Sequence, residues 1–227
     1  MTDRISVIIP TLNEEFSLPA TLQSVQSWRR QGHEVIVADG GSSDRTTHVT
    51  EGLADRLVVT SRGRALQMNA GAQVATGDVL LFLHADTVMP IGAERAVATA
   101  LARCAWGRFD VSLSGSHPLL RWVETGMNWR SRVTGIATGD QGIFVRRELF
   151  ASLGGFPEIA LMEDIALSHR LRFAYGRPAC LRERLVTSSR RWEQYGLVST
   201  ILKMWSLRLT YALGVAPIVL GRYYESR

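Results

Sequence analysis

The first 90 residues alternate between short apolar runs and stretches with helical spacing. Four runs, at 5–9, 35–38, 57–59 and 79–83, are rich in β-branched residues or leucine and show little polar alternation. Such runs predict strands that are covered on both faces. The stretches between them would form crossover helices, and right-handed crossovers bring successive strands together in parallel. The sequence therefore predicts an α/β fold, with an open, mostly parallel, twisted sheet and helices on both faces.

The helical stretches are recognised by their apolar spacing and their end signals. One apolar stripe, at steps of 4, 3 and 3, consists of Leu18, Leu22, Val25 and Trp28. A second helix would begin at Ser42 or Ser43 and end at Gly52. Further helices are expected at 64–74, 91–102, 147–153 and 163–173, and further strands at 108–113 and 141–146.

No composition break marks a linker, so we expect one domain over 1–192. The alternation of strands and helices changes after Asp86, which divides this domain into a first half, 1–90, and a second half, 91–192. Residues 193–227 would form a C-terminal amphipathic helical extension. The tryptophans at 122, 129, 192 and 205 could stack on sugar or lipid, but core packing is the commoner role and is expected here.

The extension is strongly apolar from 197 to 220 and has one narrow polar stripe, which comprises Ser199, Lys203, Ser206 and Thr210. Its longest stretch without charged, serine or threonine side chains, 211–221, is shorter than the roughly 18 residues of a spanning helix, so no spanning helix is expected. The apolar face at 197–221 would pack on the domain, lie in a membrane interface or form a homo-oligomer contact. Packing on the domain ranks first.

The positive charge lies at the C-terminal end. Residues 182–227 carry 8 basic and 3 acidic side chains, whereas residues 1–181 carry 18 of each. A basic segment suits an anionic membrane or a phosphorylated substrate, or is simply a solvated face. We expect no nucleic-acid partner, because no RNA- or DNA-binding signature is present. The N-terminus does not resemble a signal peptide, which predicts a cytoplasmic protein with a peripheral contact at the inner face of the membrane as a weaker hypothesis.

Polar residues follow each of the four predicted strands. They lie at 10–14, 39–44, 61–64 and 84–87. Because ligands of parallel sheets bind at the carboxyl ends of the strands, these loops predict a nucleotide site. The sequence lacks G-x-G-x-x-G, a Walker lysine motif and G-x-S-x-G. The charge of a diphosphate would therefore need neutralisation by arginine and by a metal ion on a carboxylate.

Taken in order, these segments resemble a known family. The segments are Val7–Glu15 (VIIPTLNEE), Val37–Thr46 (VADGGSSDRT), Asn69–Gly71, Ala75–Asp78 and Leu83–Thr87 (LHADT). Together they resemble the family-2 glycosyltransferases of the GT-A fold over roughly residues 4–192. The likeness is greatest to a bacterial branch often labelled radical-SAM/selenodomain-associated transferases.

The resemblance implies roles for the residues after the first four strands. Asp39 matches the carboxylate that accepts from the base ring of the nucleotide. The residues that match the surroundings of the nucleotide are Pro10, Thr11, Glu14 and Arg62. Asp86 matches the last carboxylate of the D-x-D motif, which holds a divalent cation. His84 stands at the first position of that motif, and imidazole suits Mn²⁺ better than Mg²⁺, so the choice between them stays open.

The second half of the chain supplies the catalytic and acceptor positions. Glu163 and Asp164 match the family's E-D pair, with Asp164 as the expected catalytic base. The other residues expected toward the acceptor are Gln141, Arg191 and Trp192. Ser188 replaces the glutamine of the Q-x-x-R-W motif of processive members, so processivity is not supported.

Each assignment also has a structural reading. A strand-ending Asp39 could serve as a cap, and the Glu163-Asp164 pair could favour the helix dipole. The Asp140-Gln141 pair could touch the acceptor or merely begin a strand. We predict a metal-dependent, inverting glycosyltransferase that uses a nucleotide-diphosphate sugar, with UDP expected, and an acceptor that is unknown or lipid-like. The alternatives are a nucleotidyltransferase and a non-catalytic module that binds sugar nucleotides.

Overall fold

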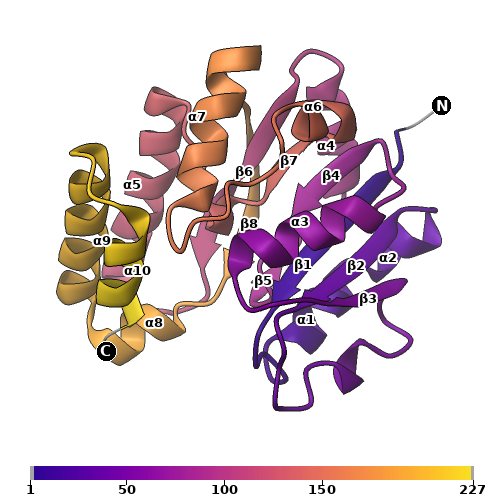
Figure 1. Ribbon diagram of the computed structural model, residues 1–227, viewed down its shortest axis with the longest axis horizontal. Coiled ribbons are helices and arrows are strands. Elements are labelled where there is room, and N and C mark those ends of the chain that lie inside the picture. The colour runs from indigo at the N-terminus through magenta and orange to yellow at the C-terminus, as the bar shows by residue number, and fades with distance from the viewer. Residues whose placement is uncertain (1–2, 226–227) are drawn as a thin grey trace.

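The computed structural model describes residues 3–225, which form one mixed sheet with helices on both faces (Figure 1). The strands are β1 (Ile5–Thr11), β2 (Glu34–Asp39), β3 (Arg56–Val59), β4 (Val79–Phe82), β5 (Thr87–Val88), β6 (Trp106–Leu113), β7 (Ile143–Arg146) and β8 (Ala179–Thr187). The helices are α1 (Leu18–Ser24), α2 (Gln26–Arg30), α3 (Arg64–Val74), α4 (Ala93–Leu101), α5 (Pro118–Thr134), α6 (Arg147–Ser152), α7 (Glu163–Tyr175), α8 (Arg190–Tyr195), α9 (Leu197–Ala212) and α10 (Pro217–Glu225).

The strand order within the described chain is β3-β2-β1-β4-β7-β6-β8-β5. The first four strands are parallel, as the sequence predicts, and Thr11 of β1 lies opposite Asp39 of β2. Beyond β4 the pairing is mixed: β7 is antiparallel to β4 and β6, whereas β6 and β8 are parallel. The carboxyl ends of β1, β2 and β4 therefore meet at one edge, where the polar loops begin.

Alternate residues of the central strands enter two separate cores. Val7 and Ile9 pack against Leu22 of α1 and the helices on that face, whereas Ile8 faces Met68 of α3. This alternation follows from the two-residue period of a strand. It explains why both faces of β1 are buried and why its sequence is almost continuously apolar.

The helix expected between Ser42 or Ser43 and Gly52 is wrong. That segment forms turns and a 3₁₀ helix at His48–Thr50. The cause is the Ser42 hydroxyl, which donates to Asp39 at 2.5 Å instead of capping a helix. The first expected helix is divided at Val25 into α1 and α2, and β5 and β8 have no counterpart among the predicted strands.

The C-terminal extension consists of two helices, α9 and α10, which gather with α5 at one end of the molecule (left in Figure 1). Leu207 and Leu220 pack in a small cluster with Met162 and Ile165 at the start of α7. The expectation of packing on the domain is met by this inner side alone. The opposite side of α9 is exposed and apolar; it comprises Val198, Leu202, Trp205, Leu209 and Leu213, which are 61–75% exposed.

The expectation that the tryptophans pack in the core is wrong for three of them. Trp122, Trp129 and Trp205 are 77%, 66% and 66% exposed. Trp122 and Trp129 lie on α5, whose inner side carries the polar network described next. Trp205 lies on α9, whose inner side carries the cluster around Leu207. Among residues 3–225, no helix is both long enough and apolar enough to cross a bilayer.

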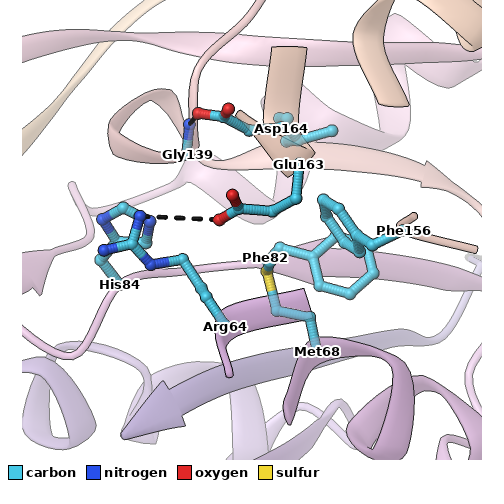
Figure 2. A pocket seen from close by; sticks show the side chains of 9 residues that line it. Arg64, Met68, Phe82, His84, Gly139, Phe156, Glu163 and Asp164 are labelled. Carbon is cyan, nitrogen blue, oxygen red and sulfur yellow. Dashed lines mark hydrogen bonds and ion pairs between the residues drawn. The ribbon is translucent and has the colours of Figure 1, made fainter. Parts of the chain in front are cut away.

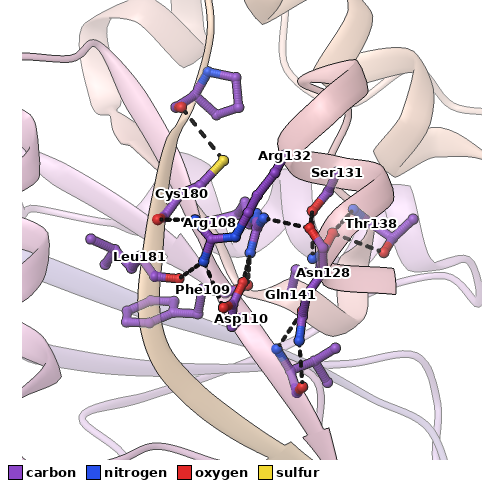
Figure 3. A network of polar contacts seen from close by, with 12 residues as sticks. Arg108, Phe109, Asp110, Asn128, Ser131, Arg132, Thr138, Gln141, Cys180 and Leu181 are labelled. Carbon is purple, nitrogen blue, oxygen red and sulfur yellow. Dashed lines mark hydrogen bonds and ion pairs between the residues drawn. The ribbon is translucent and has the colours of Figure 1, made fainter. Parts of the chain in front are cut away.

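A buried polar network fixes α5 against β6 (Figure 3). Arg108 is fully buried and pairs with Asp110, which also accepts from Arg132 at 2.6 Å. Arg108 further donates to the Asn128 carbonyl at 3.1 Å, and the Asn128 amide pairs with the backbone of Val111. The network therefore holds the helix that borders the second half of the sheet.

We expect Asp110→Ala to destabilise the fold by about 3 kcal/mol, because it leaves the buried Arg108 guanidinium without a carboxylate. Urea unfolding followed by circular dichroism measures the loss. Glu148→Gln, at an exposed position on α6, is the control and should change the free energy of unfolding by less than about 0.5 kcal/mol. Equal stability of the two variants would contradict a structural role for the Arg108–Asp110 pair.

Candidate active site

The carboxylate of Asp39 ties together the loops at the ends of β1 and β2. Its Oδ1 accepts from the hydroxyls of Thr11 at 3.1 Å and Ser42 at 2.5 Å. Its Oδ2 accepts from the backbone N–H groups of Gly41 at 2.9 Å and Ser42 at 2.8 Å. Asp39 is buried, and these four bonds use its accepting capacity. Its visible role is to shape the loop, and a contact with a nucleotide base stays a prediction.

The loop after β1 is hydrogen-bonded to the loop after β2 along its length. Asn13, at φ 54°, accepts from the Ser43 N–H at 2.8 Å, and the Glu14 N–H donates to the Thr46 hydroxyl at 2.7 Å. Glu14 also pairs with Arg190 of α8 at 3.5 Å. The expected nucleotide residues Thr11, Glu14 and Asp39 thus share one rigid double loop, which α8 contacts from the other half of the chain.

Gln67 of α3 belongs to this framework and was missed by sequence reasoning. Its buried amide donates to the carbonyls of Thr11 at 2.6 Å and Ala38 at 3.0 Å. A Cβ at Gly40 would lie 3.0 Å from the same amide. The sequence gives only a weak signal for this role, namely that Gln67 is an amide among the small and apolar residues on the buried side of the helix.

Four carboxylates surround the guanidinium of Arg64 at the start of α3. Burial lowers the pKa of Arg64, but the negative charge around it is larger in sum and raises that pKa above its usual value. The carboxylates responsible, in decreasing order of effect, are Glu163, Asp164, Asp140 and Asp86. Residues from three distant parts of the sequence therefore converge on one arginine.

Figure 2 shows a small cavity at this cluster, with a volume of about 10 Å³. It is lined by Arg64, Met68, Phe82, His84, Gly139, Ile143, Phe156, Glu163 and Asp164. The Glu163 carboxylate points toward Arg64, with Oε1 3.6 Å from the guanidinium. Apolar side chains form the opposite wall, so the charged groups meet at the rim of the core.

Asp164 lies in the first turn of α7, and its carboxylate accepts from two backbone N–H groups. Its Oδ2 accepts from Gly139 at 2.7 Å and its Oδ1 from Ile165 at 2.7 Å. Met162, at φ 69°, precedes the helix in the left-handed region and turns the chain so that Glu163 and Asp164 begin α7. Asp164 is half-buried, and it retains lone pairs for a further donor.

His84 pairs with Asp140, a pairing that the sequence did not predict. The His84 Nδ1 lies 3.2 Å from an Asp140 carboxylate oxygen. Burial alone would raise the pKa of Asp140, but the hydrogen bond and charge of His84, then Arg64 and Arg191, lower it to about 2. The His84 Nε2 is buried without a hydrogen-bond partner in the described chain and lies against Gly139.

Asp86 is half-buried, and its carboxylate makes no hydrogen bond or ion pair within the described chain. The backbone oxygen of Asp86 accepts from Ser188 at 3.2 Å, so the end of β8 lies beside it. Residues 3–225 hold no cluster of three or more His, Cys, Asp or Glu side chains arranged around a metal position. A single uncommitted carboxylate nonetheless fits a hard divalent cation that takes its remaining ligands from substrate phosphates.

The expected acceptor residues divide into two groups. Arg191 stacks on Tyr224 at 4.5 Å, and its pKa is lowered by burial and by Arg64, against the pull of Asp140 and Asp86, so it borders the cluster. Trp192 is half-buried on α8. Gln141 is 0% exposed, and its amide donates to Ser131 at 2.9 Å, away from the cluster.

Arg62 and Pro10 complete the set of expected nucleotide residues. Arg62 is exposed in the loop between β3 and α3, two residues before Arg64. Pro10 is half-buried near the end of β1, opposite Ala38 of β2. The structure thus gathers His84, Asp86, Glu163, Asp164 and Arg191 around Arg64, whereas Asp39 and Thr11 anchor the neighbouring double loop.

We expect Glu163→Gln to increase stability at pH 7. Burial, then the charge of Asp164, raises the pKa of Glu163 above its usual 4.5, so folding favours the protonated acid. The folded state then binds more protons than the unfolded state, and the wild type loses stability as the pH rises above 4.5. Thermal unfolding from pH 4 to 8 should show a gain for the variant that vanishes toward pH 4. A variant less stable than wild type at pH 7 would contradict this.

Comparison with known proteins gives a consistent result. The model of the family described as glycosyl transferase family 2 matches residues 6–146. An undecaprenyl-phosphate 4-deoxy-4-formamido-L-arabinose transferase of Pseudomonas paraeruginosa is 30% identical over 163 residues, which cover 63% of this chain and 46% of that protein. The chain spans between 34% and 46% of the length of the curated relatives it matches.

Solved structures share the fold. S. aureus TarS in complex with UDP-GlcNAc superposes with a TM-score of 0.66 at 19% identity, over 82% of this chain and 58% of that one. The mannosyltransferase PcManGT of Pyrobaculum calidifontis, in complex with GDP-Man and Mn²⁺, gives a TM-score of 0.65 at 22% identity, over 99% and 70%. At these identities the likeness concerns the fold alone.

Proposed function

The chain belongs to glycosyltransferase family 2, and on that premise we propose that it transfers a sugar from a nucleoside-diphosphate sugar to an acceptor, with inversion at the anomeric carbon. UDP is the proposed nucleotide. The observation that carries the proposal is that Arg64, His84, Glu163 and Asp164, from distant parts of the sequence, line one cavity. The narrower likeness to the radical-SAM/selenodomain-associated branch is part of the same proposal.

The division of roles follows from the chemistry of a displacement at carbon. One group must take the proton of the acceptor, and positive charge must stabilise the departing diphosphate. Asp164 is the proposed base, because two backbone N–H groups fix its carboxylate while leaving accepting capacity. With a single base and no separate nucleophile, the reaction inverts the configuration. Arg64 and Arg191 would supply fixed positive charge to the phosphates.

Asp86 is the proposed ligand of a divalent cation, since its carboxylate has no hydrogen-bond or ion-pair partner within residues 3–225. Such an ion would offset negative charge on the diphosphate. His84 is the less favoured second ligand, because its Nδ1 is paired with Asp140 and its Nε2 lies against Gly139. Mn²⁺ is the proposed ion, in keeping with the Mn²⁺ complex of the mannosyltransferase PcManGT.

The nucleoside would lie against the double loop of Pro10, Thr11, Glu14 and Asp39, with Arg62 at its exposed side. The UDP-GlcNAc complex of TarS supports a uridine donor. The GDP-Man complex of PcManGT makes guanosine the alternative base, and the experiment below distinguishes the two. The proposed domain limits, 1–192 and 193–227, place this donor half at 1–90 and the acceptor half at 91–192.

The proposed acceptor is lipid-like. The relative from Pseudomonas paraeruginosa is named for an undecaprenyl-phosphate substrate, and α5 and α9 expose apolar side chains. Glu163, Gln141, Arg191 and Trp192 would shape the acceptor side; the buried amide of Gln141 would do so indirectly, through Ser131 and Thr138. A cytoplasmic location with a peripheral membrane contact fits this acceptor.

A thermal-shift panel of UDP, GDP, ADP and CDP, with and without Mn²⁺, tests the donor. We expect UDP with Mn²⁺ to raise the melting temperature, since a ligand at about 100 times its Kd adds about 2.7 kcal/mol. The other diphosphates at the same concentration are the internal controls. A rise with GDP and none with UDP would transfer the proposal to a guanosine donor, and no rise with any diphosphate would refute it.

A further inference from the structure

Two arginines near Asp164 lack the partners that buried cations normally have. Arg130 of α5 donates through NH1 to the Ile136 carbonyl at 3.4 Å, whereas its NH2 is buried with no hydrogen-bond partner in the described chain. Arg208 of α9 is half-buried and makes no hydrogen bond or ion pair with any residue of 3–225. A buried N–H group without an acceptor destabilises a fold unless a ligand supplies one.

The positive charge of Arg208 also acts on Arg130. Burial, then the charge of Arg208, lowers the pKa of Arg130 to about 10 even though Asp164 and Asp140 oppose the shift. Burial likewise lowers the pKa of Arg208 against the same two carboxylates. The negative charge within the described chain therefore does not compensate this arginine pair, and an anion placed between them would.

The pair is connected to the proposed catalytic base through the segments that precede α7 and Gly139. Leu207, the neighbour of Arg208, packs with Met162 and Ile136. Met162 immediately precedes α7, and Ile136 precedes the turn that contains Gly139. Arg130 binds the carbonyl of that same Ile136. Arg64, which faces the donor side, is on a different helix, α3. The arginine pair and Arg64 thus approach Asp164 from separate elements.

The outer faces of the same two helices are apolar. On α5 the exposed side chains at steps of 3, 7 and 4 are Leu119, Trp122, Trp129 and Val133. On α9 the exposed stripe runs from Val198 to Leu213. Each helix thus carries a half-buried arginine beside an exposed apolar stripe. An amphiphile with an anionic head and an apolar chain matches this arrangement.

We propose that Arg130 and Arg208 bind the phosphate group of a phosphorylated acceptor that carries an apolar chain. The phosphate would lie between the two guanidinium groups, where it supplies an acceptor for the Arg130 NH2, and the chain would leave along α5 and α9. This inference rests on the proposed function, because it assigns the acceptor of that reaction.

Binding is tested without the donor, with geranyl phosphate below its micellar concentration as the probe. The fluorescence of Trp129 and Trp205, which lie close to the two arginines in sequence, reports binding. We expect geranyl phosphate to bind at least about tenfold more tightly than geraniol or inorganic phosphate, because neither carries both the charge and the chain. Arg130→Gln and Arg208→Gln should each weaken binding about tenfold, and the double variant about a hundredfold.

Arg170→Gln, at an exposed position on α7, removes the same charge elsewhere and should leave binding unchanged. Arg130→Lys keeps a cation at the position if Arg130→Gln fails to fold, and should retain more affinity than Arg208→Gln. Equal binding of geraniol and geranyl phosphate, or inorganic phosphate binding as tightly as geranyl phosphate, would overturn the inference. UDP shifts are measured on the same samples: a wild-type protein that binds UDP but not geranyl phosphate refutes this site alone, and a wild-type protein that binds neither refutes the proposed function.

Discussion

Asp164→Asn is expected to lower turnover about 1,000-fold while UDP binding stays within about twofold of wild type. Asparagine at position 164 retains a side-chain oxygen that can accept from the Gly139 N–H. The contact between the turn at Gly139 and the start of α7 should therefore persist. An amide cannot take up the proton of the acceptor, and this is the step assigned to the carboxylate. Release of UDP in the presence of donor and acceptor measures turnover, and calorimetric titration measures UDP binding.

Glu158→Gln is the matched control, since Glu158 is an exposed carboxylate in the loop before α7. It should leave both turnover and UDP binding unchanged. The same experiment decides whether the chain is a catalyst or a binding module. If neither the wild type nor Asp164→Asn shows turnover while UDP binds, the chain is a sugar-nucleotide-binding module on this fold. If Asp164→Asn retains full turnover, another residue is the base.

The nucleotide half of the fold could be predicted because its strands are buried on both faces. Such strands appear as continuous apolar runs, and parallel pairing then brings the loops that follow them to one edge. Helix α3 was predicted with its observed bounds, Arg64–Val74. The second half was harder, since β8 carries charged residues at Arg182, Glu183 and Arg184 and its exposed pattern differs from that of a buried strand.

Local capping signals failed where long-range hydrogen bonds compete with them. Ser42 could have capped a helix, but Asp39 and Asn13, the latter about 30 residues away in sequence, claim its hydroxyl. The orientation of α9 was unpredictable for a similar reason. Its inner side is chosen by contacts of Leu207 with the start of α7, and these contacts cannot be read from the period of the helix itself.

The candidate site was likewise predicted only where sequence motifs mark its residues. Asp86 and Asp164 were named from the sequence, and the structure brings them near one arginine. Arg64 was given no role, because its role comes from four carboxylates of distant segments. The pairing of Asp140 with His84 was not predicted either, because it depends on the tertiary position of His84. Arg130 and Arg208 carry no motif at all, and their significance lies in partners that the described chain does not supply.

Asp86→Asn should lose the Mn²⁺-dependent stabilisation by UDP as well as turnover, whereas Asp164→Asn should lose turnover alone. The carboxylate of Asp86 has no hydrogen-bond or ion-pair partner within residues 3–225, so we expect the free energy of unfolding to change by less than about 0.5 kcal/mol. Removal of its charge should abolish the extra thermal stabilisation that Mn²⁺ adds to UDP and lower turnover by about 1,000-fold or more. Asp164→Asn, measured alongside, should keep that Mn²⁺-dependent stabilisation. If Asp86→Asn retains it, the cation is held elsewhere, and His84 with Asp140 becomes the pair to replace next, since both lie beside Arg64 in the same cluster.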